Sequence, residues 1–150
     1  MHPGPRDRLR DGEHIAKELR ILLGSLGLNP PYILVGHSLG GLYMQDFARR
    51  YPNEVHALIL VDSTHPTQTE GKGSPESWSL WLRIILHLAV RGVAKDEFAA
   101  VDATGKSVLN LPMFRKPVVV LSAAKPLQET SELANFANDK RRDIARLYPG

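Results

Sequence analysis

The chain has 150 residues, the length of about one domain, and its hydrophobic content of 43% is ordinary for a globular protein. Its formal net charge of +3 is spread along the sequence rather than gathered in a basic block, so we expect no nucleic-acid partner. Cysteine is absent, which excludes disulfides and thiolate chemistry, and no apolar run reaches the roughly 20 residues of a membrane span. We therefore expect a soluble, cytoplasmic protein with residues 1–150 in a single domain.

The first half of the chain alternates helical and extended patterns. Asp11 can cap a helix that must end before Pro30-Pro31. Residues 32–35 and 55–61 are short, continuously apolar runs, which favour strands buried on both faces. A second helical pattern lies between these two runs. Such alternation predicts an α/β fold with a parallel sheet and right-handed crossovers.

The second half interrupts this alternation and then resumes it. A polar stretch rich in Gly, Ser and Pro predicts an exposed loop, and two helical patterns follow it before a third apolar strand and a final helix. The loop is predicted at residues 67–77, the two helices at 78–90 and 96–109, the strand at 117–122 and the final helix at 127–147. We expect a core formed by residues 11–66 and 112–150, with a lid-like helical insertion at about 67–111.

The stretch Gly36-His37-Ser38-Leu39-Gly40 has the pattern G-x-S-x-G at the junction of the first strand and the second helix. A sharp strand-to-helix turn forces the serine backbone into a sparsely populated conformation, and small neighbours make room for it. Such a turn would raise the Ser38 hydroxyl above the carboxyl ends of the strands, where open α/β sheets bind ligands. The Leu39 backbone NH would face the same point at the positive end of the helix. The alternative is a glycine-rich turn without catalysis.

Residues 31–66, PYILVGHSLGGLYMQDFARRYPNEVHALILVDSTHP, closely resemble the α/β-hydrolase superfamily. The likeness includes the strand, the GHSLGG elbow, a helix ending in Arg-Tyr-Pro and a strand ending in Val-Asp, and the flanking elements fit the same order. It implies a serine hydrolase acting on a small-molecule carboxylic ester or related acyl bond, without a cofactor or metal. In that case Ser38 is the nucleophile and the Leu39 NH is one oxyanion donor.

The family's pattern is incomplete in this sequence. Its acid and then its histidine follow the serine along the chain, yet no histidine follows His87. The resemblance thus implies about three parallel strands of a partial α/β-hydrolase fold that lacks the catalytic histidine and the first strands. We expect the isolated chain to be nearly inactive, because a serine hydroxyl without a base is a weak nucleophile. The alternative is a non-catalytic fragment or interaction module, and exposed sheet edges favour self-association.

Two carboxylates compete for the role of the triad acid. Asp62 follows the second predicted strand and Glu129 follows the third, and we favour Asp62. The alternative for Asp62 is a turn residue that binds local amides. His65, three residues further on, is either a substitute base or a packed turn histidine, and His37 is assigned to the packing of the elbow. The six histidines form no pair at the spacing of metal ligands.

A second motif, residues 100–107 with the sequence AVDATGKS, resembles a phosphate-binding loop with Ala in place of its first Gly. That loop requires a buried strand before it and a helix after it, whereas the residues before this stretch favour helix. We therefore predict no nucleotide site, and a solvated turn at Thr104-Gly105-Lys106. The tryptophans and leucines of residues 78–88 have helical spacing, which fits either packing of the insertion or the lining of an acyl pocket.

Overall fold

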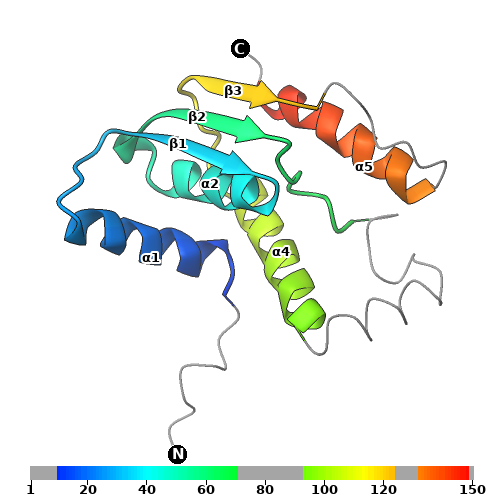
Figure 1. Ribbon diagram of the computed structural model, residues 1–150, viewed down its shortest axis with the longest axis horizontal. Helices are drawn as coiled ribbons and strands as arrows, with labels where there is room; N and C mark the ends of the chain where they lie inside the picture. Colours follow the sequence, from blue (N-terminus) through cyan, green and yellow to red (C-terminus); the bar gives the residue numbers. More distant parts are fainter. Residues whose placement is uncertain (1–9, 71–92, 124–131, 149–150) are drawn as a thin grey trace, which may run out of the picture.

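The computed structural model describes residues 10–70, 93–123 and 132–148 (Figure 1). The predicted helix over 78–90 and the alternative acid Glu129 lie outside these residues. The described elements are α1 (Gly12–Ser25), β1 (Tyr32–His37), α2 (Leu39–Arg50), the short 3-10 turn η1 (Pro52–Glu54), β2 (Val55–Val61), α4 (Val93–Asn110), β3 (Val118–Leu121), α5 (Glu132–Asp143) and η4 (Ile144–Leu147).

The sheet has three strands in the order β1-β2-β3, and both pairs are parallel. His37 of β1 pairs with Val61 of β2, and Val61 pairs with Leu121 of β3. The carboxyl ends of all three strands therefore lie at one edge of the sheet, as the arrowheads in Figure 1 show. The predicted parallel α/β architecture is confirmed.

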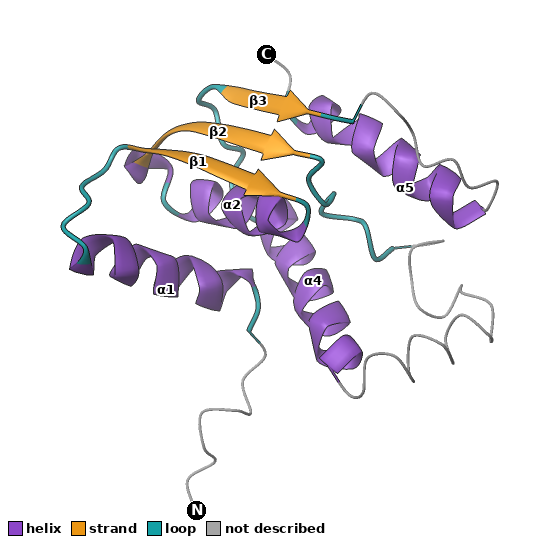
Figure 2. Cartoon of the chain, viewed as in Figure 1, coloured by secondary structure: helices purple, strands orange, loops and turns teal. Residues whose placement is uncertain are grey.

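Helices α1, α2 and α4 lie on the same side of the sheet (Figure 2). Helix α2 contacts β1 and β2 directly, and α1 and α4 pack against α2. The strand residues that point toward α2 are buried: Leu34 is 6% exposed, and Leu58 and Leu60 are fully covered. They join Phe47 of α2 and Ile144 of η4 in one hydrophobic core, which fixes the position of the strand ends.

The opposite face of the sheet is open in the described part of the chain. Ile33 and Val35 of β1 are each 61% exposed, and Val119 and Leu121 of β3 are 48% and 52% exposed. The prediction of strands buried on both faces is wrong for β1 and β3. An apolar run shows that both faces of a strand favour burial, but it does not show which segment would cover each face.

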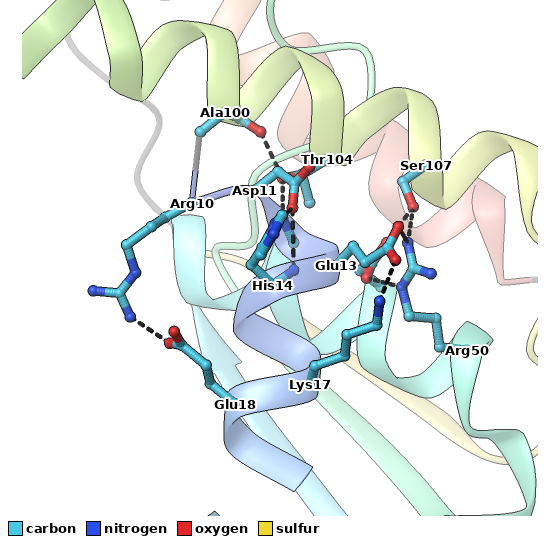
Figure 3. A network of polar contacts seen from close by, with 12 residues as sticks. Arg10, Asp11, Glu13, His14, Lys17, Glu18, Arg50, Ala100, Thr104 and Ser107 are labelled. Atoms are coloured by element: carbon cyan, nitrogen blue, oxygen red, sulfur yellow. Dashed lines mark hydrogen bonds and ion pairs between the residues drawn. The ribbon is translucent and has the colours of Figure 1, made fainter. Parts of the chain in front are cut away.

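The prediction of a helix begun by Asp11 is confirmed. The Asp11 carboxylate accepts a hydrogen bond of 3.1 Å from the His14 backbone NH, and α1 starts at Gly12. The same side chain lies 2.8 Å from Nδ1 of His14 (Figure 3). One of the orphan NH groups at the start of α1 is thereby satisfied.

Helix α4 is tied to α1 and α2 by a polar network (Figure 3). The Thr104 hydroxyl accepts a 2.7 Å hydrogen bond from the Gly12 NH and donates one of 2.6 Å to the Ala100 carbonyl. The Ser107 hydroxyl donates to the buried Asp46 carboxylate at 2.5 Å. Helix α4, which falls within the predicted insertion at about 67–111, packs against α2 and α1 on the side of the sheet that these helices cover.

The prediction of a solvated turn at Thr104-Gly105-Lys106 is wrong. These residues lie inside α4, and Thr104 is completely buried. A Cβ on Gly105 would come within 2.0 Å of the Pro66 carbonyl oxygen, so the glycine permits close packing instead of breaking the helix. Only Lys106 of the three is exposed, and its ammonium group lies 2.7 Å from the Asp102 carboxylate one helical turn away.

Candidate active site

Ser38 occupies the junction between β1 and α2 with φ 50° and ψ −124°, a left-handed conformation that is uncommon for a residue other than glycine. Its side chain is exposed and does not cap α2. Among the described residues its hydroxyl has no hydrogen-bond partner. The hydroxyl is thus presented at the carboxyl edge of the sheet, as the motif predicted for its position.

Backbone hydrogen bonds hold Ser38 in this conformation. Its NH donates to the Val61 carbonyl at 3.1 Å, which ties it to the end of β2. Its carbonyl accepts bonds of 3.0 Å from the NH groups of both Gly41 and Thr64. A left-handed residue other than glycine costs about 1–3 kcal/mol and persists only where its surroundings over-determine it. The end of β2, the first turn of α2 and the loop after β2 each supply one of these three bonds.

Two of the three elbow glycines are required by close contacts. A Cβ on Gly36 would lie 2.6 Å from the Gly40 carbonyl oxygen, and a Cβ on Gly41 would lie 2.2 Å from the Ser63 hydroxyl oxygen. Both distances are far below van der Waals contact. A Cβ on Gly40 would meet nothing within 4 Å. Gly36 therefore lets the turn close, and Gly41 lets the loop after β2 approach the first turn of α2.

Leu39 is the first residue of α2, so its NH has no carbonyl acceptor within the helix. The partial positive charge of the helix N-terminus also favours a negatively charged atom at this NH. Leu39 directly follows the exposed Ser38 in sequence and space. This arrangement is suited to stabilising a negatively charged oxygen on a carbon atom that has become bonded to the Ser38 hydroxyl oxygen.

Asp62 directly follows β2, as Ser38 directly follows β1, and it also has a left-handed backbone, with φ 41°. Its NH donates to the Leu121 carbonyl at 2.8 Å, and its carboxylate accepts from the Ala123 NH at 2.8 Å. Asp62 therefore joins the ends of β2 and β3. The Ala123 NH that Asp62 binds lies just after β3, and not in the turn that follows β2. Among the described residues, no histidine bonds to this carboxylate.

His65 has the features of a packed turn histidine. It is 7% exposed, and its Nδ1 lies 3.1 Å from the Thr67 NH and 3.0 Å from the Thr67 hydroxyl. Burial, reinforced by the positive charge of Lys140, lowers the pKa of His65 to about 4. A histidine with this pKa accepts a proton poorly at neutral pH, so the environment favours packing over a role as base. His37 of the elbow is exposed at the end of β1.

A buried polar network beneath the elbow was not found from the sequence. Gln45 of α2 is fully buried, and its amide nitrogen donates to the Ser63 hydroxyl at 3.0 Å and the Thr64 carbonyl at 3.3 Å. Its amide oxygen accepts from the Tyr148 hydroxyl at 3.0 Å. The available signal was a glutamine one turn from Leu42, on the apolar side of the helix.

Arg49, one turn after Gln45 on α2, is 6% exposed. One of its terminal nitrogens donates to the Val108 carbonyl at 2.8 Å, and its guanidinium lies 5.5 Å from the centre of the Tyr148 ring. These contacts join α2 to the end of α4 and to the residue that follows η4. The role of Arg49 in the fold is therefore structural.

The described residues contain no group of three or more His, Cys, Asp or Glu side chains placed to hold a metal ion. None of the helices in this part of the chain is long and apolar enough to cross a membrane.

Comparison with known proteins identifies the relatives of this chain. The model of a family described as "alpha/beta hydrolase fold" matches residues 3–93. The human (lyso)-N-acylphosphatidylethanolamine lipase is 32% identical over 78 residues, which are 49% of this chain and 22% of the lipase. The homoserine O-acetyltransferase of Sulfurimonas autotrophica is 37% identical over 54 residues, which are 36% of this chain and 15% of that enzyme.

Solved structures share the fold over nearly the whole chain. The monoacylglycerol lipase of Paleococcus ferrophilus aligns with a TM-score of 0.51 and 17% identity, covering 92% of this chain and 63% of the lipase. The NocB thioesterase domain, solved as a covalent complex with a fluorophosphonate nocardicin G analog, aligns with a TM-score of 0.52 and 18% identity. That match covers 98% of this chain and 79% of the domain. The chain spans less than two thirds of the length of the Paleococcus ferrophilus lipase, and its match covers about a fifth of the human lipase.

Proposed function

Because the chain belongs to the alpha/beta hydrolase fold family, we propose that it carries the nucleophile of an acyl-transfer hydrolase and that this nucleophile is Ser38. The supporting observation is the exposed Ser38 hydroxyl, which a left-handed backbone holds at the carboxyl edge of a parallel sheet. A nucleophile must be accessible to substrate, and a strained conformation that persists requires a network such as the one described above. A glycine-rich turn without catalysis would not require a serine at this position.

The proposed reaction begins with attack of the Ser38 hydroxyl oxygen on the carbonyl carbon of an ester. The serine proton passes to a base, and the carbonyl oxygen becomes an oxyanion that the Leu39 NH stabilises. Collapse of this intermediate breaks the bond to the alcohol, which leaves with a proton, and the acyl group stays on Ser38. Water then releases the acid by the same steps. No histidine among the described residues is hydrogen-bonded to Ser38, so the described part of the chain does not identify the base.

We assign the role of triad acid to Asp62. Its place at the end of β2 puts it next to Ser38 along the carboxyl edge, and its second carboxylate oxygen has no partner among the described residues. In serine hydrolases the acid holds the histidine in its working tautomer instead of accepting the proton itself. Asp62 would perform that task only together with a histidine, and no histidine among the described residues bonds to its carboxylate.

The substrate is proposed to be a small molecule with an ester or related acyl bond. The human relative is named as a lipase and the Sulfurimonas relative as an acetyltransferase, and both names describe reactions on acyl groups. Those enzymes are much longer than the matched regions, so their individual substrates do not transfer to this chain. The described residues identify no base and only one candidate oxyanion donor, the Leu39 NH, and by themselves they should support only a slow reaction, since the lack of one donor typically lowers the rate by a factor of about 100 to 1000.

A fluorophosphonate probe tests the proposal, because it forms a covalent bond with an activated serine. The full chain should be labelled slowly and to one equivalent, and Ser38→Ala should abolish the label. Ser122→Ala provides a matched control, since Ser122 is also an exposed serine just after a parallel strand, and it should leave the label unchanged. An unlabelled folded chain, or equal labelling of Ser38→Ala, would instead favour the non-catalytic module.

A further inference from the structure

We propose that Gln45 is a positioning residue for Ser38, acting through the loop that follows β2. Gln45 does not touch Ser38. Its amide nitrogen is bonded to the Ser63 hydroxyl and to the Thr64 carbonyl, and the NH of Thr64 is bonded to the Ser38 carbonyl at 3.0 Å. Two hydrogen-bonded steps therefore connect a fully buried glutamine to the backbone of the candidate nucleophile.

The glutamine is well suited to this task because both ends of its amide are used. Its oxygen accepts from the Tyr148 hydroxyl at 3.0 Å, which fixes which end of the amide faces the loop. Ser63 is 3% exposed, and its hydroxyl also lies 3.3 Å from the Thr64 carbonyl, so it reinforces the same contact. A chain of hydrogen bonds thus runs from the residue after η4, through α2, to the loop after β2.

The need for such a chain follows from the strain at the elbow. Ser38 adopts a left-handed conformation, and it stays there only while its neighbours hold its NH and carbonyl groups. The anchor at Val61 lies in the sheet ladder and is rigid. The Thr64 NH that binds the Ser38 carbonyl lies in a loop, where no sheet hydrogen bonds hold Thr64 in position. The Gln45 amide holds Thr64 there instead, through the Thr64 carbonyl. Loss of this contact should free Thr64 first and then loosen Ser38.

This inference predicts a local effect that general destabilisation would not produce. Gln45→Met keeps the volume of the side chain but removes its hydrogen bonds. In the full chain, loss of the bond to the Thr64 carbonyl should speed hydrogen–deuterium exchange of the Thr64 and Gly41 amides about tenfold, with little change at the amides of β2. Val55→Ala is the matched control, because Val55 is buried at the opposite end of β2 and its truncation should act globally.

The inference would be overturned if Gln45→Met and Val55→Ala raised hydrogen–deuterium exchange at the same amides and by the same factors. If Gln45→Met does not fold, Tyr148→Phe serves instead, because it keeps the ring and removes only the hydroxyl, which donates to the Gln45 amide oxygen and accepts a long bond of 3.5 Å from Arg49. Tyr148→Phe should raise exchange at the same two amides by a smaller factor, and no rise at Thr64 would count against the proposal.

The consequence for chemistry rests on the proposed role of Ser38 as a nucleophile. If that role is correct, Gln45→Met should slow fluorophosphonate labelling about tenfold under conditions where the variant remains folded. An unlabelled wild-type chain would refute the nucleophile proposal alone, because the exchange measurement would still decide whether Gln45 positions the loop. Labelling of the variant at the wild-type rate would refute the positioning role.

Discussion

Replacing Gly41 by alanine should destabilise the chain, whereas the same replacement at Gly40 should not. The added Cβ of Gly41→Ala would lie 2.2 Å from the hydroxyl oxygen and 2.6 Å from the Cβ of Ser63, whereas at Gly40 it would meet nothing within 4 Å. Ser63 is buried and bonded to Gln45, so it cannot swing away without breaking that bond. Overpacking of this kind costs about 1–3 kcal/mol.

The two adjacent glycines form a matched pair. Alanine is favoured over glycine within a helix by up to about 1 kcal/mol, and both positions lie in the first turn of α2. Gly40→Ala should therefore raise the free energy of unfolding slightly, and Gly41→Ala should lower it. The propensity gain is common to both variants, so their difference should equal the overpacking cost of about 1–3 kcal/mol, which corresponds to roughly 2–12 °C in Tm for a chain of this size.

Urea and thermal unfolding, followed by circular dichroism, would measure this difference. Adding Ser63→Gly to Gly41→Ala removes the side chain that the new Cβ meets, so the double variant should recover part of the loss. The recovery should appear as a coupling energy in a double-mutant cycle. Equal stabilities of Gly40→Ala and Gly41→Ala, or no coupling between positions 41 and 63, would refute the packing described at the elbow.

Three further changes have expected outcomes. Gly105→Ala should lower Tm more than Gly41→Ala, because its Cβ would lie 2.0 Å from the Pro66 carbonyl oxygen, which is fixed backbone; an unchanged Tm would contradict the close packing of α4. The pKa of His65 is about 4 when folded and 6.5 ordinarily, so the unfolded chain binds the proton more tightly. The free energy of unfolding should therefore keep its full value above pH 6.5 and fall by about 1–3 kcal/mol as the pH drops toward 4. Urea unfolding of His65→Asn at several pH values should show a smaller fall over the same range. Finally, the chain should self-associate through the sheet face and sheet edges that no described residue covers, and Ile33→Thr with Val35→Lys should shift sedimentation toward the monomer; identical sedimentation at all concentrations would count against this.

The sequence was most informative where a local signal and the final structure coincide. Asp11 was predicted to cap α1 because a carboxylate before an apolar helical pattern satisfies free NH groups at the helix start, and it does so. The turn at Ser38 was predicted because glycines on both sides of a serine, between a strand and a helix, serve few other purposes. These features depend on residues within a few positions of one another.

The sequence was less informative where distant residues decide the outcome. Gly105 was interpreted as a turn residue, but its lack of a side chain serves contact with Pro66 and so depends on a segment far away in the sequence. Gln45 gave only the weak signal of a polar residue among apolar ones, because its partners come from two other parts of the fold. The exposed face at Val35 could not be predicted, since an apolar strand does not specify what covers it.

The left-handed backbones of Ser38 and Asp62 differ in what their side chains contribute to the fold. Glycine adopts such conformations without the penalty that a side chain brings, so glycine at either position would relieve strain. The Asp62 carboxylate offsets part of that penalty, because it accepts a hydrogen bond from the Ala123 NH and joins the ends of β2 and β3. The Ser38 hydroxyl bonds to no described residue, so within the described part of the chain nothing that its side chain does offsets the penalty. Resistance to heat would therefore favour glycine at position 38 more than at position 62.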